Sequence, residues 1–162
     1  MAFGTFIAGE DLTPGLPLAV TAAGVVYKCC PTNPNTRNLA GISIDTVSAG
    51  GAVRVCFDTL PTDTFSDLVP GEQYYTGMTS GTILSGSNNF DIELQNTGYP
   101  SAYLNLIGTA ITTTQINLER ANPRLLQNKT ANVILTEASS SAVTPMFILQ
   151  EDGYKIELEV AS

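Results

Sequence analysis

The sequence contains no histidine, and this absence excludes much of ordinary enzyme chemistry. Histidine is the side chain whose charge changes most readily near neutral pH, and it is the commonest metal ligand. Without it, a serine–histidine–aspartate triad cannot form, and zinc sites that depend on histidine are excluded. Tryptophan is absent as well, so an aromatic platform for a carbohydrate would have to use tyrosine.

Charged side chains are also scarce. They make up 14% of the chain, against roughly 25% in an average soluble protein. Lysine and arginine number 7 and aspartate and glutamate 15, which gives a net charge of −8. No segment gathers the basic side chains that contact nucleic-acid phosphates or an anionic membrane surface. We therefore expect neither nucleic acid nor a membrane among the partners.

Cysteine occurs only three times, at Cys29, Cys30 and Cys56. A secreted disulfide framework usually has more cysteines, in even number. The start of the chain, Met1–Ile7, has no basic residues and no long apolar run, so we expect no signal peptide. No apolar stretch reaches the roughly 18 residues of a membrane-spanning helix. The sequence thus favours free thiols in a reducing compartment.

The sequence is instead rich in strand-like alternation. Its 162 residues, 43% of them hydrophobic, suffice for one domain that buries its core without disulfides or metals. Apolar and polar residues alternate with a period of two, which predicts half-buried strands. The clearest runs are Val53–Phe57, Phe90–Leu94, Ile116–Leu118 and Tyr154–Val160. The best helical candidate is short, from Ala121 to Lys129, with Pro123 in its first turn.

Turns rich in glycine and proline separate these runs, which predicts an all-β fold: a compact antiparallel β-barrel or sandwich with a short C-terminal β extension. We expect the barrel or sandwich domain to span residues 1–120. Residues 121–162 form the extension, with strands at Val133–Glu137 and in a hairpin of Met146–Gln150 and Tyr154–Val160. About 40 residues cannot bury a core alone, so the extension is expected to pack on the same domain or on a neighbouring subunit.

Two groups of carboxylates invite a chemical interpretation. The spacing of Asp58, Asp63 and Asp67 does not match a calcium-binding loop, and a solvated acidic loop explains it better. Asp91 and Glu93 lie two residues apart, as the solvent face of a strand would place them, and we do not interpret them as a glycosidase pair. We therefore expect no metal site and no acid–base pair.

The remaining candidates are a thiol pair and a sequon. Cys29 and Cys30 lack a histidine that would activate a thiol nucleophile. The sequon that begins at Asn128 matters only in a secreted eukaryotic protein. The sequence thus predicts no catalytic residue and no cofactor, and a protein that is not an enzyme.

Tyrosines supply the candidate interface residues. Tyr74 and Tyr75 are adjacent, so on a strand their rings point to opposite faces and one of them can point outward. Tyrosine is enriched at protein–protein interfaces and among the residues that dominate binding energy. The candidate anchors are Tyr74, Tyr75, Tyr99 and Tyr103.

The order of turns and strands over residues 6–119 resembles that of small β-domains in virion proteins of tailed bacteriophages, of the head-decoration and fibre-module types. The segments that carry the resemblance are Ala8–Gly15, Gly24–Lys28, Ala40–Ser43, Ala49–Val55, Leu68–Tyr75, Gly81–Ile83 and Leu106–Leu118. The chain beyond Arg120 is not part of this pattern.

The resemblance implies a structural protein of the virion, assembled in the host cytoplasm. Within that class we expect a capsid decoration, or cement, protein that binds the outer shell. Its partners would be the major capsid protein or other virion proteins, and we expect a homo-oligomer. One alternative is a head-fibre, neck or tail-associated adaptor module of the same particle. A second alternative is a carbohydrate-binding β-domain, which the lack of tryptophan disfavours.

Overall fold

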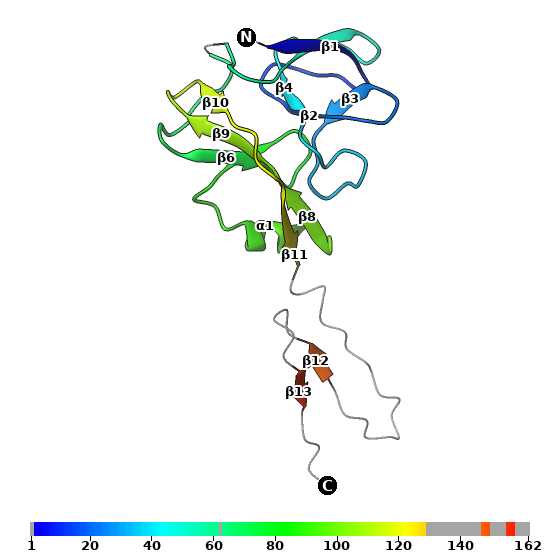
Figure 1. Ribbon diagram of the computed structural model, residues 1–162, viewed down its shortest axis with the longest axis vertical. Helices are drawn as coiled ribbons and strands as arrows, with labels where there is room; N and C mark the ends of the chain where they lie inside the picture. The colour runs from blue at the N-terminus through cyan, green and yellow to red at the C-terminus, as the bar shows by residue number, and fades with distance from the viewer. Residues whose placement is uncertain (1, 62, 129–146, 150–154, 158–162) are drawn as a thin grey trace.

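A computed structural model describes residues 2–61, 63–128, 147–149 and 155–157 (Figure 1). Apart from one short helix, the regular structure in these residues is β-strand, so the prediction of an all-β barrel or sandwich is confirmed. None of the described helical structure has the length and apolar character that crossing a membrane requires. The elements are β1 (Phe3–Ala8), β2 (Pro17–Val20), β3 (Val25–Lys28), β4 (Gly41–Ser43), β5 (Ala52–Cys56), β6 (Gln73–Thr76), β7 (Ile83–Ser85), α1 (Phe90–Thr97), β8 (Ser101–Leu104), β9 (Leu106–Ala110), β10 (Ile116–Leu118), β11 (Arg124–Gln127), β12 (Phe147–Leu149) and β13 (Lys155–Glu157).

The first five strands close into a barrel in the order β1-β3-β2-β4-β5. Strand β1 pairs antiparallel with β5, with Phe6 opposite Val53. It pairs parallel with β3, with Ile7 opposite Val25, so the barrel is not antiparallel throughout as the sequence suggested. The residues from Phe3 to Ile7 pair with β5, whereas the pairing with β3 is confined to Ile7 and Ala8. Alternate side chains fill the barrel, among them Leu18, Val26, Val53 and Val55.

A second sheet, in the order β10-β9-β6-β7, packs against the barrel. The shared core takes Ile42 and Cys56 from the barrel and Tyr74, Ile107 and Ile116 from the sheet. The chain between the two units contributes Leu60 and Leu68 to the same cluster. Because these side chains are buried together, the barrel and the sheet form one body.

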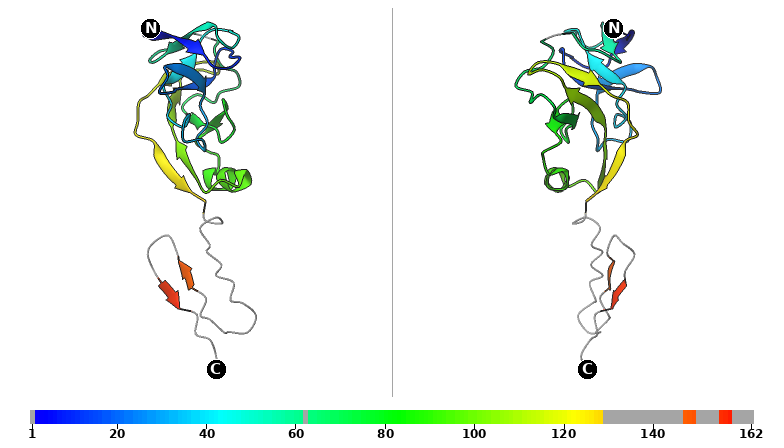
Figure 2. Two further views of the ribbon diagram at one scale, coloured as in Figure 1. Left: turned by 90° about the vertical axis from the view of Figure 1, so that its right-hand side faces the viewer. Right: turned by 60° about the vertical axis from the view of Figure 1, so that its left-hand side comes forward.

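A two-stranded ribbon, β8 with β11, extends the body on the side away from β1 (Figure 1). Its register places Leu126 opposite Ala102 and Leu125 opposite Tyr103. The helix α1 covers one face of the ribbon, and a third core cluster forms there from Met78, Leu94, Ala102, Leu104 and Leu126. Both views of Figure 2 show the ribbon and α1 at one end of the body and β1 at the other.

The prediction of a strand at Phe90–Leu94 is wrong, because these residues begin α1. The side chain of Asn89 caps the helix by accepting a hydrogen bond from the Ile92 amide at 3.3 Å. Gly98, with φ of 71°, ends it in the left-handed conformation. The alternation covers five residues only, and Phe90 and Leu94 are equally well placed on one face of a helix.

The expected helix at 121–129 is also wrong, since residues 124–127 form β11. Leu125 and Leu126 point to opposite sides of this strand, and only Leu126 is buried. This part of the expected C-terminal extension therefore belongs to the sheet structure of the main body. The expected hairpin is confirmed where it is described, with Ile148 of β12 opposite Ile156 of β13. The expected strand at 133–137 lies outside the described residues.

Candidate interaction surfaces

Two of the four candidate tyrosines serve the interior of their own chain. Tyr74 is buried in the core between barrel and sheet, and its hydroxyl accepts a hydrogen bond from the Val69 amide at 2.9 Å. The ring of Tyr75 packs edge-on against Phe90 at 5.3 Å between ring centroids. Tyr74 therefore stabilises the fold and offers no ring to a partner, while Tyr75 helps to seat α1.

The other two tyrosines lie at or near the surface of the ribbon. Tyr103 faces Leu125 across the strand pair, on the side opposite the core residues Ala102 and Leu126. Leu125 is 49% exposed and Tyr99, just after α1, is 53% exposed. We call the group of Tyr99, Tyr103 and Leu125 the ribbon face. It is an apolar surface at the end of the body remote from β1.

Arg37 borders the ribbon face. Its guanidinium carbon lies 3.9 Å from the centroid of the Tyr103 ring, which is a cation–π geometry. Its Nε atom is buried and has no hydrogen-bond partner among the described residues. A fixed positive charge thus stands beside the apolar side chains of this face.

A second exposed apolar surface lies on β1. Phe3 and Ile7 are 51% and 49% exposed, and with Thr5 they alternate along the outer side of the strand. Arg54 and Ala52 of β5 lie opposite Thr5 and Ile7. We call these five residues the β1 face. The sequence did not reveal it, because Phe6 between the outer residues points inward and makes β1 apolar on both sides.

Charge on the β1 face is neutralised locally. The Arg54 guanidinium makes hydrogen bonds of 2.5 and 3.0 Å to the two carboxylate oxygens of Asp45. This contact holds the pKa of Asp45 below its usual value. The guanidinium carbon of Arg54 also lies 5.8 Å from the centroid of the Phe3 ring. A partner that covers the face would therefore meet a paired charge and not an isolated one.

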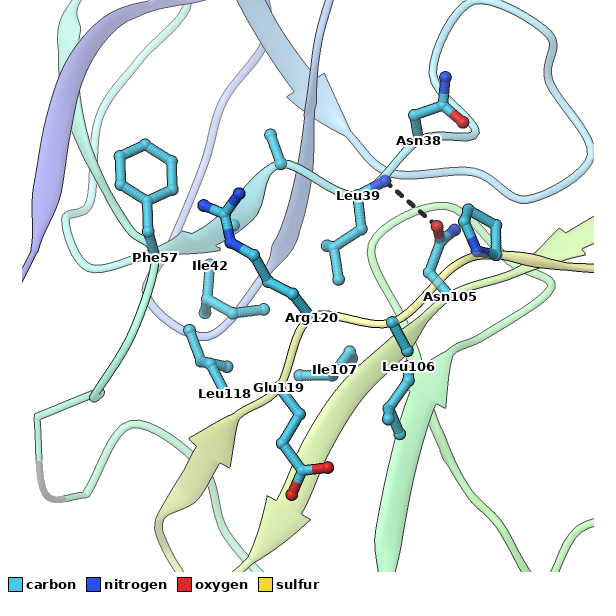
Figure 3. A pocket seen from close by; sticks show the side chains of 14 residues that line it. Asn38, Leu39, Ile42, Phe57, Asn105, Leu106, Ile107, Leu118, Glu119 and Arg120 are labelled. Atoms are coloured by element: carbon cyan, nitrogen blue, oxygen red, sulfur yellow. Dashed lines mark hydrogen bonds between the residues drawn. The ribbon is translucent and has the colours of Figure 1, made fainter.

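A pocket of about 380 Å³ opens between the barrel and the second sheet (Figure 3). Side chains from β4, β9 and β10 line it, and most of them are apolar. They include Leu39, Ile42, Phe57, Leu106, Ile107 and Leu118. The volume falls within the range of roughly 300–1,000 Å³ that is usual for ligand sites.

Arg120 is the cation of the pocket wall. Its guanidinium carbon lies 6.0 Å from the Phe57 ring centroid. Over the described part of the chain, ion pairs form between Lys28 and Glu10 and between Arg54 and Asp45, so Arg120 has no carboxylate partner there. The neighbouring carboxylate of Glu119 accepts a hydrogen bond from Thr109 Oγ1 at 2.7 Å and points away from the Arg120 guanidinium (Figure 3).

Asn105 joins the pocket to the ribbon. It lies at the junction of β8 and β9, and its side-chain nitrogen donates to the carbonyl of Arg37 at 2.7 Å. Its side-chain oxygen accepts from the Leu39 amide at 3.4 Å, as the dashed line in Figure 3 marks. Both Asn105 and Leu39 line the pocket. The pocket and the Arg37 edge of the ribbon face are therefore neighbours on the surface.

Three of the carboxylates singled out in the sequence have structural roles in the described residues. Both oxygens of Asp58 accept hydrogen bonds from the Ala2 amide, at 2.7 and 2.8 Å, and this lowers the pKa of Asp58. Asp91 and Glu93 lie in the first turn of α1, where negative charge favours a helix. Asp63 and Asp67 adopt positive φ, at 64° and 59°. Within the described ranges, no three cysteine or acidic side chains gather as a metal site.

The three cysteines are free thiols. Cys29 and Cys56 are buried and Cys30 is partly exposed. Burial, with a smaller contribution from neighbouring Cys30, raises the pKa of the Cys29 thiol to about 12. The sequon residue Asn128 is buried, and its side-chain nitrogen donates to the carbonyl of Tyr99 at 3.0 Å.

No protein-family model matches this chain, and no curated protein matches it. The function is therefore argued from its own residues and surfaces.

Proposed function

We propose that the protein is a structural component of a tailed-phage virion, a capsid decoration protein that binds the outer shell through its β1 face and catalyses nothing. The observation that carries this proposal is the exposure of Phe3 and Ile7 on a strand that is part of a closed barrel. Exposed apolar groups gathered on one surface often mark a protein-binding site.

The geometry of the β1 face suits a contact between rigid surfaces. Its backbone is held in a closed barrel, so little conformational freedom is lost when a partner covers it. Its one charged side chain, Arg54, is already paired with Asp45, so burial leaves no lone charge without a partner. Each contact is small, and a repeated shell lattice multiplies many such contacts into stable attachment.

The resemblance to phage virion β-domains supports the same proposal. It covers residues 6–119, which span the barrel, the second sheet, α1 and β8. The partners are then the major capsid protein or other virion proteins, and the place of the protein is the assembled particle.

One observation favours a second candidate, a head-fibre, neck or tail-associated adaptor. The β1 face and the ribbon face lie at opposite ends of the body (Figure 2). An adaptor needs two such surfaces, one for each component that it joins. A carbohydrate-binding domain remains the third candidate, with Tyr99 as its one strongly exposed tyrosine ring in the described residues.

The test uses purified particles that lack the protein. The double variant Phe3→Ser, Ile7→Ser removes the two apolar groups, while Val69→Ser is the control, because Val69 is 56% exposed but lies outside the β1 face. Burying each apolar side chain contributes about 1.5–3 kcal/mol, so the double variant should bind the shell at least about tenfold more weakly. The control should bind like the unmodified protein. Equal binding of both variants, or no binding of the unmodified protein, would contradict the proposal.

A further inference from the structure

Strand β11 has one edge without a hydrogen-bonding partner among the described residues. The strand pairs with β8, with Arg124 opposite Leu104 and Leu126 opposite Ala102. Within the described part of the chain no other strand joins β11, and both views of Figure 2 show it at the margin of the body. We call the side of β11 that faces away from β8 the outer edge.

The hydrogen bonds of the ribbon identify the backbone groups on the outer edge. The Tyr103 amide donates to the carbonyl of Pro31 at 2.9 Å, away from β11. Tyr103 and Leu125 lie opposite each other, so they form a non-hydrogen-bonded pair, and the amide and carbonyl of Leu125 point outward. Backbone groups alternate along a strand, so those of Gln127 point outward too. The Asn128 amide fits this alternation, because it donates at 2.8 Å to the residue before β8.

Two other sheet edges are covered by the chain itself. At β10 the Leu118 amide donates to the carbonyl of Asp58 at 3.2 Å, and at β7 the Ser85 carbonyl accepts from the Asn88 amide at 3.0 Å. The outer edge of β11 has no such cover among the described residues, and its Leu125 is 49% exposed. Proteins usually protect a free edge, so an open edge beside an exposed leucine suits the addition of another strand.

We propose that the outer edge of β11 pairs with the same edge of a second copy of the chain, antiparallel about a two-fold axis, so that two ribbons form one four-stranded sheet. In the register that we assign, Leu125 of each copy lies opposite Gln127 of the other. Each such pair exchanges two hydrogen bonds, so the two pairs use every outward backbone group of both residues. This inference goes beyond the proposed binding to a shell and does not depend on it.

The edge is complementary to itself in this register. A two-fold contact needs the same pattern on both sides, and the outward groups of Leu125 and Gln127 supply it. In the neighbouring register, Leu125 meets Leu125 of the second copy and Gln127 meets Pro123, which has no amide to donate. The Gln127 carbonyl is then left without a bond. The opposite shift brings Leu125 to residue 129, beyond the described strand.

The side chains and charges of β11 agree with the same register. The Leu125 side chains of the two copies become diagonal neighbours on the ribbon face, which is within reach of a contact. Each Arg124 lies four residues along the strand from its equivalent, or about 13 Å. This separation exceeds the Debye length of about 8 Å at physiological salt, so repulsion between the two arginines is largely screened.

The first experiment measures self-association of the full chain by sedimentation velocity over a range of concentrations. Gln127→Pro removes an outward amide, and proline is tolerated on an edge strand where its nitrogen faces outward. Dimerisation should weaken by about tenfold or more, because two hydrogen bonds are lost per dimer. Gln127→Ala is the matched control, since it keeps the amide and should associate like the unmodified chain. Equal association of the two variants would overturn the inference, as would a chain that is monomeric at every concentration.

A second pair of variants changes exposed side chains only and tests the register. Leu125→Lys with Gln127→Glu places opposite charges across the contact, whereas Leu125→Lys with Gln127→Lys places like charges there. At low salt the first variant should dimerise about tenfold more tightly than the second, and the difference should shrink at high salt. Equal dimerisation of the two at low salt would overturn the assigned register and the inference with it.

Hydrogen exchange of individual amides reports directly on the outer edge. The amides of Leu125 and Gln127 should exchange rapidly in the dilute monomer and become protected as the dimer forms. The Leu126 amide is the internal control, because it faces β8 and should be protected at every concentration. Rapid exchange of Leu125 and Gln127 in the dimer would overturn the inference. Protection of both in the monomer would overturn it too, because another part of the same chain would then cover the edge.

These measurements use the protein alone in solution. Shell binding through the β1 face is measured separately with particles, so a failure of strand pairing and a failure of the proposed function are distinguishable.

Discussion

Three cysteines of the same chain differ in their surroundings, and their reactivity should differ accordingly. Cys29 and Cys56 are buried while Cys30 is partly exposed. Because the thiolate is the reactive form, a pKa of about 12 for Cys29 keeps its thiol protonated at pH 8.

We therefore predict that a thiol reagent at pH 8 modifies Cys30 of the folded protein first and Cys29 last. In denaturant without reductant all three thiols should react, because none is held in a disulfide. The measurement is the time course of modification followed by mass spectrometry of the labelled peptides. Equal rates for Cys29 and Cys30 in the folded protein would contradict the burial that the structure shows.

Gly108 joins β9 to both of its neighbours, opposite Tyr74 of β6 and Leu118 of β10. Its φ of 157° is unfavourable for other residues, and an added Cβ would lie 1.9 Å from the carbonyl oxygen of Asn117. That oxygen belongs to the backbone of β10, so only a shift of the strand can relieve the clash.

We predict that Gly108→Ala lowers the free energy of unfolding by about 2–4 kcal/mol. Gly24→Ala is the control, since Gly24 has φ of 76° but open space around an added Cβ. It should lower the free energy by only about 1–2 kcal/mol. Urea denaturation of both variants measures the difference, and equal losses would argue against the close approach of β9 and β10.

Among the elements, α1 is the one whose sequence pattern predicts a strand although the structure has a helix. As a strand, Phe90, Ile92 and Leu94 would share one buried face. As a helix, Leu94 faces β8 and β11 and is fully buried, whereas Ile92 is 52% exposed. Substitution of the two aliphatic residues therefore separates the two structures.

Leu94→Ala should lower the free energy of unfolding by about 2–5 kcal/mol, the usual range for a buried leucine. Ile92→Ala should change it by no more than about 0.5 kcal/mol. Thermal or urea unfolding of the two variants gives the answer. Comparable large losses at both positions would favour the strand and contradict α1.

The strands that the sequence predicts well are those in which one face alone is apolar and buried. The alternation at Val53–Phe57 matches β5 because Val53 and Val55 fill the barrel while Arg54 faces out. Short segments fail for a physical reason: five residues fit a period of two and a period of 3.6 almost equally well. At α1 the capping residues Asn89 and Gly98 carry the missing information.

The surfaces were harder to predict than the strands. Composition marks Tyr74 and Tyr103 as equal candidates, and only tertiary packing buries the first in the core and places the second on the ribbon. The pocket was not foreseen at all, because Ile42, Asn105 and Arg120 are far apart in the sequence. Adjacency of this kind depends on how the barrel and the second sheet pack.

At the scale of the whole molecule, the protein is one β-body with β1 at one end and the ribbon at the other (Figures 1 and 2). A pocket lies between its barrel and its second sheet. The β1 face is proposed to meet the shell. This contact joins protein to protein, which suits a chain whose net charge of −8 would repel nucleic-acid phosphates.

The proposed function requires that the protein bind an assembled shell in many copies, mainly through buried apolar groups. The most direct measurement is co-sedimentation of the purified protein with particles that lack it, as a function of protein concentration at low and at high salt. We predict saturable binding in many copies that persists at high salt, because apolar contacts are not screened as exposed charges are. Absence of binding to the shell, or binding only to free DNA or to a glycan, would contradict it.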